Sequence, residues 1–231
     1  MAGPGPESRP AGAESHRGAS IELADWRRRI ATLYAEVRDR AADDPAAAWD
    51  HWRAVREAMY REHPQSPVPA GDRPDFRARH WPYDPGLRFE VEVEADGALD
   101  VARRGGSPPA PAILPMSVGD ELAFSRIGRV TIPFPAGSRT LDLFWMAGYA
   151  GGLFLPFRDA TNGHETYGAG RYLLDGAKSA DLGGDLAAGH LVLDFNFAFQ
   201  PSCAFDPRWA CPLAPPENRL DIRIEAGERL A

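Results

Sequence analysis

The sequence predicts an α+β fold in which two N-terminal helices pack on an antiparallel β-sandwich or a partly open β-barrel. Apolar residues recur at helical spacing between residues 21 and 63. From residue 87 onward they alternate with polar residues, as in strands with one buried face. Glycine and proline then separate short apolar segments with no helical pattern between them, which favours antiparallel strands over βαβ units.

The helical part is expected over residues 20–64, after a tail. Residues 1–19 are rich in Pro, Gly, Ala and Ser without periodicity, so we expect this tail to be disordered. A first helix is expected from about Ile21 to Arg40, with an apolar stripe opposite its Arg and Glu residues. Asp44-Pro45 is a favourable start for a second helix, Asp as N-cap and Pro at the first helical position, and this helix should stop near His63-Pro64. The two helices should cover one face of the β-rich part through Trp26, Trp49 and Trp52.

The β-rich part is expected over residues 86–231, within a single domain of residues 20–231. Leu87, Phe89, Val91 and Val93 alternate with charged residues and predict a half-buried strand. Asp96-Gly97 is a hairpin signal, with residues 98–103 as the partner strand. Further strands are expected at 121–127, 129–134, 140–147, 152–157, 170–174, 190–197 and 220–225.

Composition excludes several classes of function. The 231-residue chain has a formal net charge of -7, and Lys178 is its sole lysine. An acidic chain without a basic stripe repels phosphate backbones, so we expect no nucleic-acid partner. There is no uninterrupted apolar run near 18 residues and no apolar leader, so we expect no membrane partner and a cytoplasmic location. The sequence does not indicate an oligomeric state.

Most residues that suggest chemistry lie in two polar and aromatic blocks, Pro156–Asp175 and Leu193–Asn218. They read PFRDATNGHETYGAGRYLLD and LDFNFAFQPSCAFDPRWACPLAPPEN. Neither block contains a known catalytic signature. Gly168-Ala169-Gly170 is not a phosphate loop, because no Lys-Ser/Thr pair and no helical pattern follow it.

In these blocks the chain resembles the domain-of-unknown-function family 1684 of bacterial proteins. The closing IEAGER also matches, and a weaker likeness extends upstream through HPQSPVP and HWPYDP. Phe199-Gln200 stands where Tyr-Asn is the commoner family pattern, which leaves the role of that pair open. The resemblance implies a shared architecture and a shared pocket, and it implies no activity.

Arg171 and Asp194 are the central pair of the candidate site. Asp194 and Asn196 are two apart on an expected strand, so they should share a face, and Arg171-Tyr172 begins another strand. One interpretation is a pocket in which Arg171 holds an anionic or carbonyl group and Asp194 moves a proton. The other is a structural Arg–Asp pair, the commoner role of such charges.

Three further groups have both a functional and a structural interpretation. Glu165, with Tyr167 beside it, is a candidate second carboxylate of an acid–base pair, after a turn at Asp159–Gly163. The stiff Pro215-Pro216 segment can direct Glu217 and Asn218 into a cavity, or it can simply run along the edge of a sheet, where proline is tolerated.

The third group is Cys203 and Cys211, with seven residues between them. This is neither a redox C-x-x-C nor a usual zinc spacing, and we expect no metal. The pair could form a disulfide closing a short loop, two buried thiols or one nucleophile, and we favour a structural role. We expect the two residues to approach within disulfide range.

These observations lead to a hypothesis of a cofactor-independent small-molecule enzyme. Its catalytic residues would be Arg171, Asp194 and Glu217, with acid–base chemistry on a carboxylate- or carbonyl-bearing metabolite. The ligand-binding residues would be Glu165, Tyr167, Tyr172, Asn196 and Asn218. The alternative is a non-catalytic module that binds a ligand or a partner. An enzyme should show two carboxylates facing an open space near Arg171, whereas a binding or structural protein would bury those side chains in mutual pairs.

Overall fold

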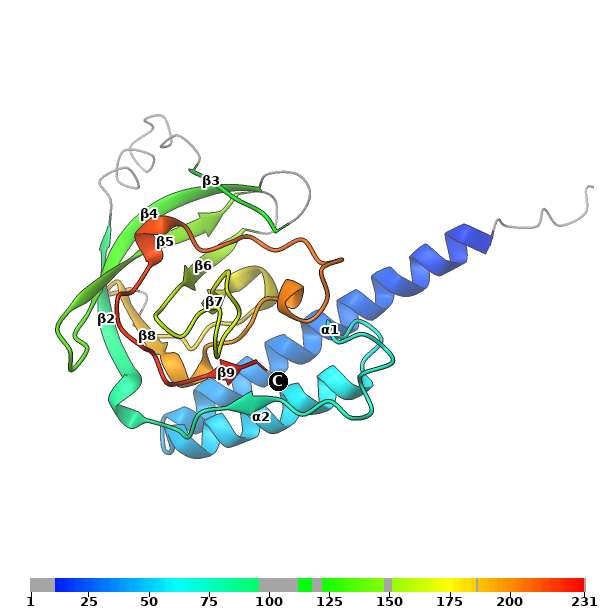
Figure 1. Ribbon diagram of the computed structural model, residues 1–231, viewed down its shortest axis with the longest axis horizontal. Coiled ribbons are helices and arrows are strands. Elements are labelled where there is room, and N and C mark those ends of the chain that lie inside the picture. Colours follow the sequence, from blue (N-terminus) through cyan, green and yellow to red (C-terminus); the bar gives the residue numbers. More distant parts are fainter. Residues whose placement is uncertain (1–10, 96–111, 118–121, 148–150, 186, 231) are drawn as a thin grey trace, which may run out of the picture.

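The structure, a computed structural model, describes residues 11–95, 112–117, 122–147, 151–185 and 187–230. Within these residues two α-helices precede nine β-strands, and short 3-10 turns follow several of the strands. The sheet is antiparallel and strongly curled into a half-barrel, beside which the helices pack (Figure 1). The predicted α+β fold with N-terminal helices is confirmed.

Helix α1 spans Ala11–Ala41 and helix α2 spans Pro45–Glu62. Helix α2 begins as expected, because the Asp44 side chain accepts a hydrogen bond from the Ala47 amide at 3.0 Å and Pro45 occupies the first turn. Helix α1 begins ten residues before the expected Ile21, so disorder through residue 19 is wrong for residues 11–19. Ala, Glu and Arg are good helix formers, and extending a nucleated helix needs no buried face. Residues 1–10 lie outside the described residues.

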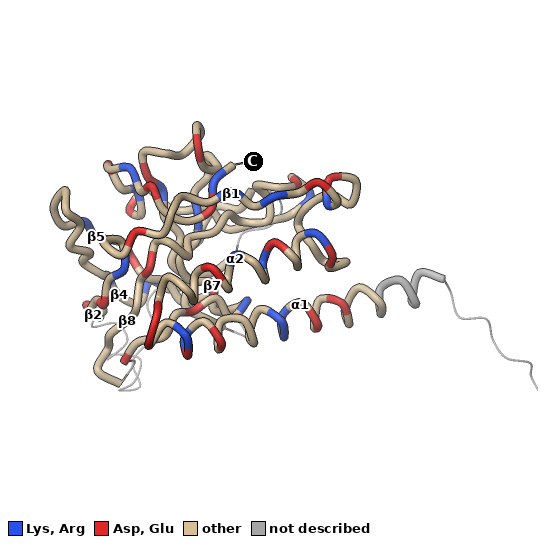
Figure 2. The backbone as a smooth tube through the Cα atoms, turned by 90° about the horizontal axis from the view of Figure 1, so that it is seen from below, with Lys and Arg blue, Asp and Glu red and all other residues tan. Residues whose placement is uncertain are grey.

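Helix α1 projects past the rest of the fold at its N-terminal end in two perpendicular views (Figures 1 and 2). Figure 2 also shows acidic and basic residues interspersed along the backbone, as expected from the scattered charges of the sequence.

The larger sheet has seven strands within the described residues, in the order β7-β6-β5-β4-β2-β8, and β3 pairs with β4 beside this path. Strands β1 and β9 pair separately, which joins residues 79–80 to residues 228–229. All of these pairs are antiparallel. The strands are β1 (Arg79–His80), β2 (Arg88–Ala95), β3 (Ala112–Leu114), β4 (Leu122–Ile132), β5 (Arg139–Met146), β6 (Gly152–Phe157), β7 (Arg171–Asp175), β8 (His190–Asp194) and β9 (Glu228–Arg229).

The strands predicted at 121–127 and 129–134 are one strand, β4, and Gly128 is the reason for the difference. The register against β5 shifts between Arg126 and Gly128, as at a bulge. A Cβ at position 128 would lie 2.7 Å from the carbonyl oxygen of Glu94 on β2. Glycine therefore permits close approach of a neighbouring strand here instead of ending a strand.

Two other predicted strands differ from the structure. The strand expected at 190–197 ends at Asp194, and Phe195–Phe197 forms a 3-10 turn. The strand expected at 220–225 is wrong, because this segment is irregular. Leu220 and Ile224 are buried in it, and its backbone makes only isolated hydrogen bonds to other described backbone groups, from the Leu220 amide to the Arg158 carbonyl and from the Ala160 amide to the Ile222 carbonyl. The expected hairpin at 96–103 lies outside the described residues.

Apolar residues form two core clusters. In the first, Trp49 and Trp52 of α2 pack with side chains of the sheet, and the Trp52 and Phe197 rings meet edge to face with their centroids 5.3 Å apart. The second cluster lies on the remaining strands and includes Leu220 and Ile224 of the irregular C-terminal segment. The sheet is therefore covered by helices in one region and by the C-terminal segment in another.

Candidate functional site

Arg171, the expected anion-binding residue, is fully buried and holds the C-terminal segment. Its guanidinium donates hydrogen bonds to the backbone carbonyls of Ile224, Ala226 and Glu228, and it forms an ion pair of 3.3 Å with Asp159. Burial lowers the pKa of Arg171 from 12.5 to about 10, with Asp159 opposing that change. The carboxylate that forms an ion pair with Arg171 is therefore Asp159, whereas the sequence had suggested Asp194.

Asp194 and Asn196 form a separate buried network around the chain at Asp84. The Asp194 carboxylate accepts hydrogen bonds from the Asn196 amide and side chain and from the Tyr83 hydroxyl, and it lies 3.6 Å from Arg88. Asn196 in turn binds the backbone N–H and carbonyl of Asp84, both at 2.8 Å. Burial raises the pKa of Asp194 above 3.8. This network fixes the entry to β2 and leaves Asp194 facing no open space.

Glu217 and Asn218 point to different environments. Glu217 is exposed, whereas Asn218 is fully buried between β5 and β6. The Asn218 side chain accepts from the Asp142 amide and donates to the carbonyls of Asp142 and Pro156. Asn218 therefore joins strands, and Glu217 faces solvent.

Glu165 and Tyr167 lie on the turn before β7. The Glu165 carboxylate pairs with Arg223 and lies 3.7 Å from Arg229, so it binds the C-terminal segment at the surface. The Tyr167 backbone amide donates to the side chain of Gln200 at 3.1 Å. Arg171 and Asp194 are buried in separate hydrogen-bond networks and Glu217 is exposed, so these three side chains serve separate contacts.

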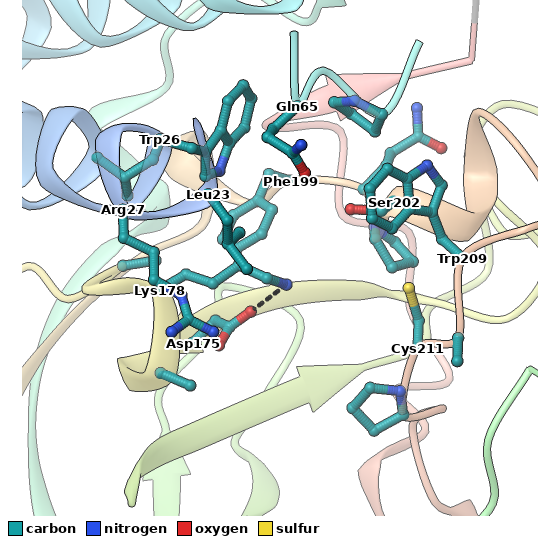
Figure 3. Close-up of a pocket in the computed structure, with 18 of the residues that line it drawn as sticks. Leu23, Trp26, Arg27, Gln65, Asp175, Lys178, Phe199, Ser202, Trp209 and Cys211 are labelled. Carbon is teal, nitrogen blue, oxygen red and sulfur yellow. Dashed lines mark hydrogen bonds and ion pairs between the residues drawn. The ribbon is translucent and has the colours of Figure 1, made fainter. Parts of the chain in front are cut away.

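A different cavity of about 200 Å³ lies between α1, the loop after α2, the end of β7 and the segment 199–212. Figure 3 shows Trp26 and Arg27 of α1 on one side and Ser202 and Trp209 on the other. Trp26, Tyr60, Phe154, Phe199 and Trp209 supply its aromatic lining. Tyr172, an expected ligand-binding residue, is buried beside it, with its ring 4.8 Å from that of Phe154 between centroids.

The cavity carries an excess of positive charge. Its charged lining residues are Arg27, Arg56, Asp175 and Lys178. Lys178 pairs with Asp175 at 2.7 Å, and Arg56 pairs with Glu228 at 2.8 Å. Burial disfavours the charged form of Lys178, but Asp175 outweighs this and raises the Lys178 pKa. Arg27 is exposed and has no hydrogen bond or ion pair with any described residue, so its guanidinium faces solvent at the mouth of the cavity and is available to a ligand.

Two more donors in the cavity wall lack partners among the described residues. The indole N–H of Trp209 is buried without a hydrogen bond. The Ser202 hydroxyl also has no partner, and Figure 3 places it beside Trp209. Gln200, by contrast, is occupied, because its side chain binds the backbone of Tyr167 and Arg229. Buried donors without partners are uncommon in folded proteins, and an acceptor bound in the cavity would satisfy the Trp209 indole. Other buried atoms without a partner in the described part of the chain, such as Trp52 Nε1, lie away from this cavity.

Cys203 and Cys211 are free thiols in contact near this cavity. Both are buried, and the Cys203 amide donates to the Cys211 sulfur at 3.3 Å. Cys211 lines the cavity (Figure 3). Among the described residues no cluster of three or more His, Cys, Asp or Glu could hold a metal ion.

A second hollow of about 930 Å³ lies along the outer side of α1 and α2. It is larger, but its lining is the exposed groove between two helices, with Glu22, Arg28 and Glu36 among its residues. It has no aromatic wall, so we take the smaller cavity as the candidate site.

Sequence reasoning missed the residues that α1 and the loop after α2 bring to the cavity. Trp26 was assigned to the core, and Arg27 looked like a solvated charge. Lys178 did stand out as the sole lysine, and that was the one available signal. Its place beside Asp175 depends on the turn after β7, which no local pattern indicates.

Comparison with known proteins places the chain in a family without an assigned activity. The family model described as "Protein of unknown function (DUF1684)" matches residues 77–229. The chain belongs to this family. The DUF1684 match begins after the two helices and includes Lys178 and both cysteines. No curated protein matches the chain.

A solved structure extends the likeness to the helical part. The solution NMR structure of an uncharacterized protein from Haloarcula marismortui has 29% sequence identity and a TM-score of 0.57, covering 83% of this chain and 97% of that one. Its description assigns no ligand. Among the helices of the described ranges, none has the length and apolar character needed to cross a membrane.

Proposed function

We propose that this protein binds a small anion with a flat apolar body, such as an aromatic carboxylate, in the cavity between α1 and the segment 199–212. The observation that carries the proposal is the convergence of unpartnered donors on an aromatic cavity. The Trp209 indole N–H is buried without a partner among the described residues, the side chains of Arg27 and Ser202 make no hydrogen bond with any of these residues, and all three line the same space. A carboxylate accepts several such hydrogen bonds at once.

The size of the cavity limits the ligand. Pockets that hold drug-sized ligands have volumes of roughly 300–1,000 Å³. The cavity here is about 200 Å³, so a single ring with one charged group is the expected scale. The ring would lie against Trp26, Phe199 or Trp209, and the charge would lie near Arg27 and Lys178.

Binding is better supported than acid–base catalysis. An acid–base enzyme of the expected kind needs two carboxylates facing an open space. Asp175 is the carboxylate among the residues lining this cavity, and Lys178 neutralises it. Asp159 and Asp194 are held in buried hydrogen bonds elsewhere. The proposal is therefore a ligand-binding protein that uses no cofactor.

The cytoplasm is the proposed location. Its support is the pair of free thiols in contact, since oxidising compartments convert such pairs to disulfides. Acidic and basic residues interspersed along the chain, with no basic stripe, support a small-molecule partner over a nucleic acid.

The test is a binding titration of benzoate against benzamide, followed by tryptophan fluorescence, because Trp26 and Trp209 line the cavity. Benzoate should bind and benzamide, its uncharged analogue, should bind at least about tenfold more weakly, the effect of one charge-assisted contact. Arg27→Met should weaken benzoate binding by about tenfold. Trp209→Phe, which removes the indole N–H, should weaken it roughly fivefold.

The matched control is Arg28→Met, the same change at the next residue of α1. Arg28 is exposed and lines the outer groove instead of the cavity. Equal affinity of benzoate and benzamide, or equal losses in Arg27→Met and Arg28→Met, would remove the basis for an anion site here.

A further inference from the structure

The two cysteines of the chain are brought into contact by the fold of the segment between them. Ser202–Ala204 forms a 3-10 turn, and the Asp206 amide donates back to the Ser202 carbonyl. The segment then returns, and the Cys203 amide donates to Cys211 Sγ at 3.3 Å. Ser117 fixes the far side, because its hydroxyl accepts from the Cys211 amide at 2.9 Å and donates to the Trp209 carbonyl at 3.0 Å.

The environment distinguishes the two sulfurs. The Cys211 thiol, together with the Tyr167 hydroxyl, lowers the pKa of Cys203 to about 6 against the effect of burial. The same hydrogen bond, together with burial, raises the pKa of Cys211. The two pKa shifts run in opposite directions, so Cys203 is the sulfur that loses its proton more readily.

We propose that Cys203 and Cys211 form a reactive dithiol site that a small hydroperoxide oxidises to an intramolecular disulfide. This goes beyond ligand binding and does not depend on which anion the cavity accepts. A purely structural pair of buried thiols would need neither the direct contact of the two residues nor a cavity beside them. Cys211 lines the cavity, which gives a small oxidant a path to the pair.

The oxidation proceeds in two balanced steps. The Cys203 thiolate attacks one peroxide oxygen, the O–O bond breaks, and the leaving hydroxide takes a proton, which gives water and a sulfenic acid on Cys203. The Cys211 sulfur then attacks the Cys203 sulfur, the S–O bond breaks, and the hydroxyl leaves with the Cys211 proton as a second water. Two thiols lose two electrons in total, and the peroxide gains them.

The test treats the folded full-length protein with hydrogen peroxide and follows intact mass and free thiols. The wild type should lose two hydrogen atoms in mass and both reactive thiols while remaining a monomer on a non-reducing gel. In Cys211→Ser, a sulfenic acid should accumulate on Cys203 and react with dimedone. In Cys203→Ser, peroxide should be consumed at least about tenfold more slowly, because burial still disfavours the thiolate of the remaining Cys211.

Three results would overturn the proposal. One is a wild-type protein that keeps both thiols after prolonged treatment with hydrogen peroxide. This result requires no variant, so it holds even if the serine variants do not fold. Another is oxidation that yields only disulfide-linked dimers. The last is dimedone labelling of Cys211 in Cys203→Ser at the rate seen for Cys203 in Cys211→Ser.

Discussion

Replacing Arg171 with methionine is predicted to cost about 3–5 kcal/mol of unfolding free energy, the range for removing one partner of a buried ion pair. The Arg171 side chain is fully buried. Methionine fills similar volume but leaves the carbonyls of Ile224, Ala226 and Glu228 without these donors. Each buried acceptor that loses its donor costs roughly 1–3 kcal/mol of stability. Removing the guanidinium also removes the free-energy cost of burying its charge, which offsets part of this loss.

Asp159 moderates the loss. Its carboxylate keeps hydrogen bonds from the Ile224 amide at 2.7 Å and the Thr161 hydroxyl at 2.8 Å after Arg171 is removed. The anion is thus partly satisfied, which is why the estimate remains near 3–5 kcal/mol instead of exceeding it.

The measurement is urea unfolding followed by circular dichroism. For a chain of this size the urea midpoint should fall by roughly 1–2 M, since the slope is about 2–3 kcal/mol per M. Arg219→Met is the matched control, because Arg219 is exposed, and it should change stability by less than about 0.5 kcal/mol. A loss below about 1 kcal/mol in Arg171→Met would refute the argument that this guanidinium anchors the C-terminal segment.

Three further predictions concern the helical layer. Trp52→Ala should cost about 3–5 kcal/mol in chemical unfolding, because the ring is fully buried, and a cost below about 1 kcal/mol would mean that α2 is loosely held. Glu228→Gln should destabilise the protein by about 3–5 kcal/mol, because Arg56 is then buried without its counter-charge. The double change Arg56→Met/Glu228→Met should recover much of this stability. An equal or larger loss of stability in the double variant would contradict the pairing. Burial lowers the pKa of His80 from 6.5 to about 4, so its contribution to stability is complete above pH 6.5 and is lost as the pH falls toward 4. His80→Gln should flatten the stability-pH curve over that window by up to about 3 kcal/mol, and an unchanged slope in thermal melts would count against a neutral His80.

The start of α2 could be predicted from the sequence because its causes are local. Asp44 and Pro45 act on the turn they begin, and that turn formed as expected. The prediction of a strand at 220–225 was wrong because the structure of this segment depends on residues far away in the sequence. Leu220 and Ile224 alternate like a strand, but the carbonyl of Ile224 is bound by Arg171, more than 50 residues earlier in the chain.

The candidate site was less predictable than the fold. Polar residues in the two sequence blocks looked like one pocket, yet Arg171 and Asp194 each satisfy a different buried segment. The cavity depends on Arg27 of α1 and Trp209 of the segment 199–212 meeting across a gap. The pattern within one segment does not indicate which distant segment it will face. Of the cavity's lining residues, Cys211 was considered from the sequence for a structural role, and Lys178 was noted only as the sole lysine.

The position of the last segment sets the order in which the protein can fold during synthesis. Strand β9 pairs with β1, roughly 150 residues earlier, and Leu220, Ile224 and Ala226 complete the second core cluster. Until these residues leave the ribosome, the apolar interior of the curled sheet remains uncovered and the buried Arg171 lacks its acceptors. The nascent chain must therefore wait as an incompletely closed sheet, a state with exposed apolar surface that chaperones recognise.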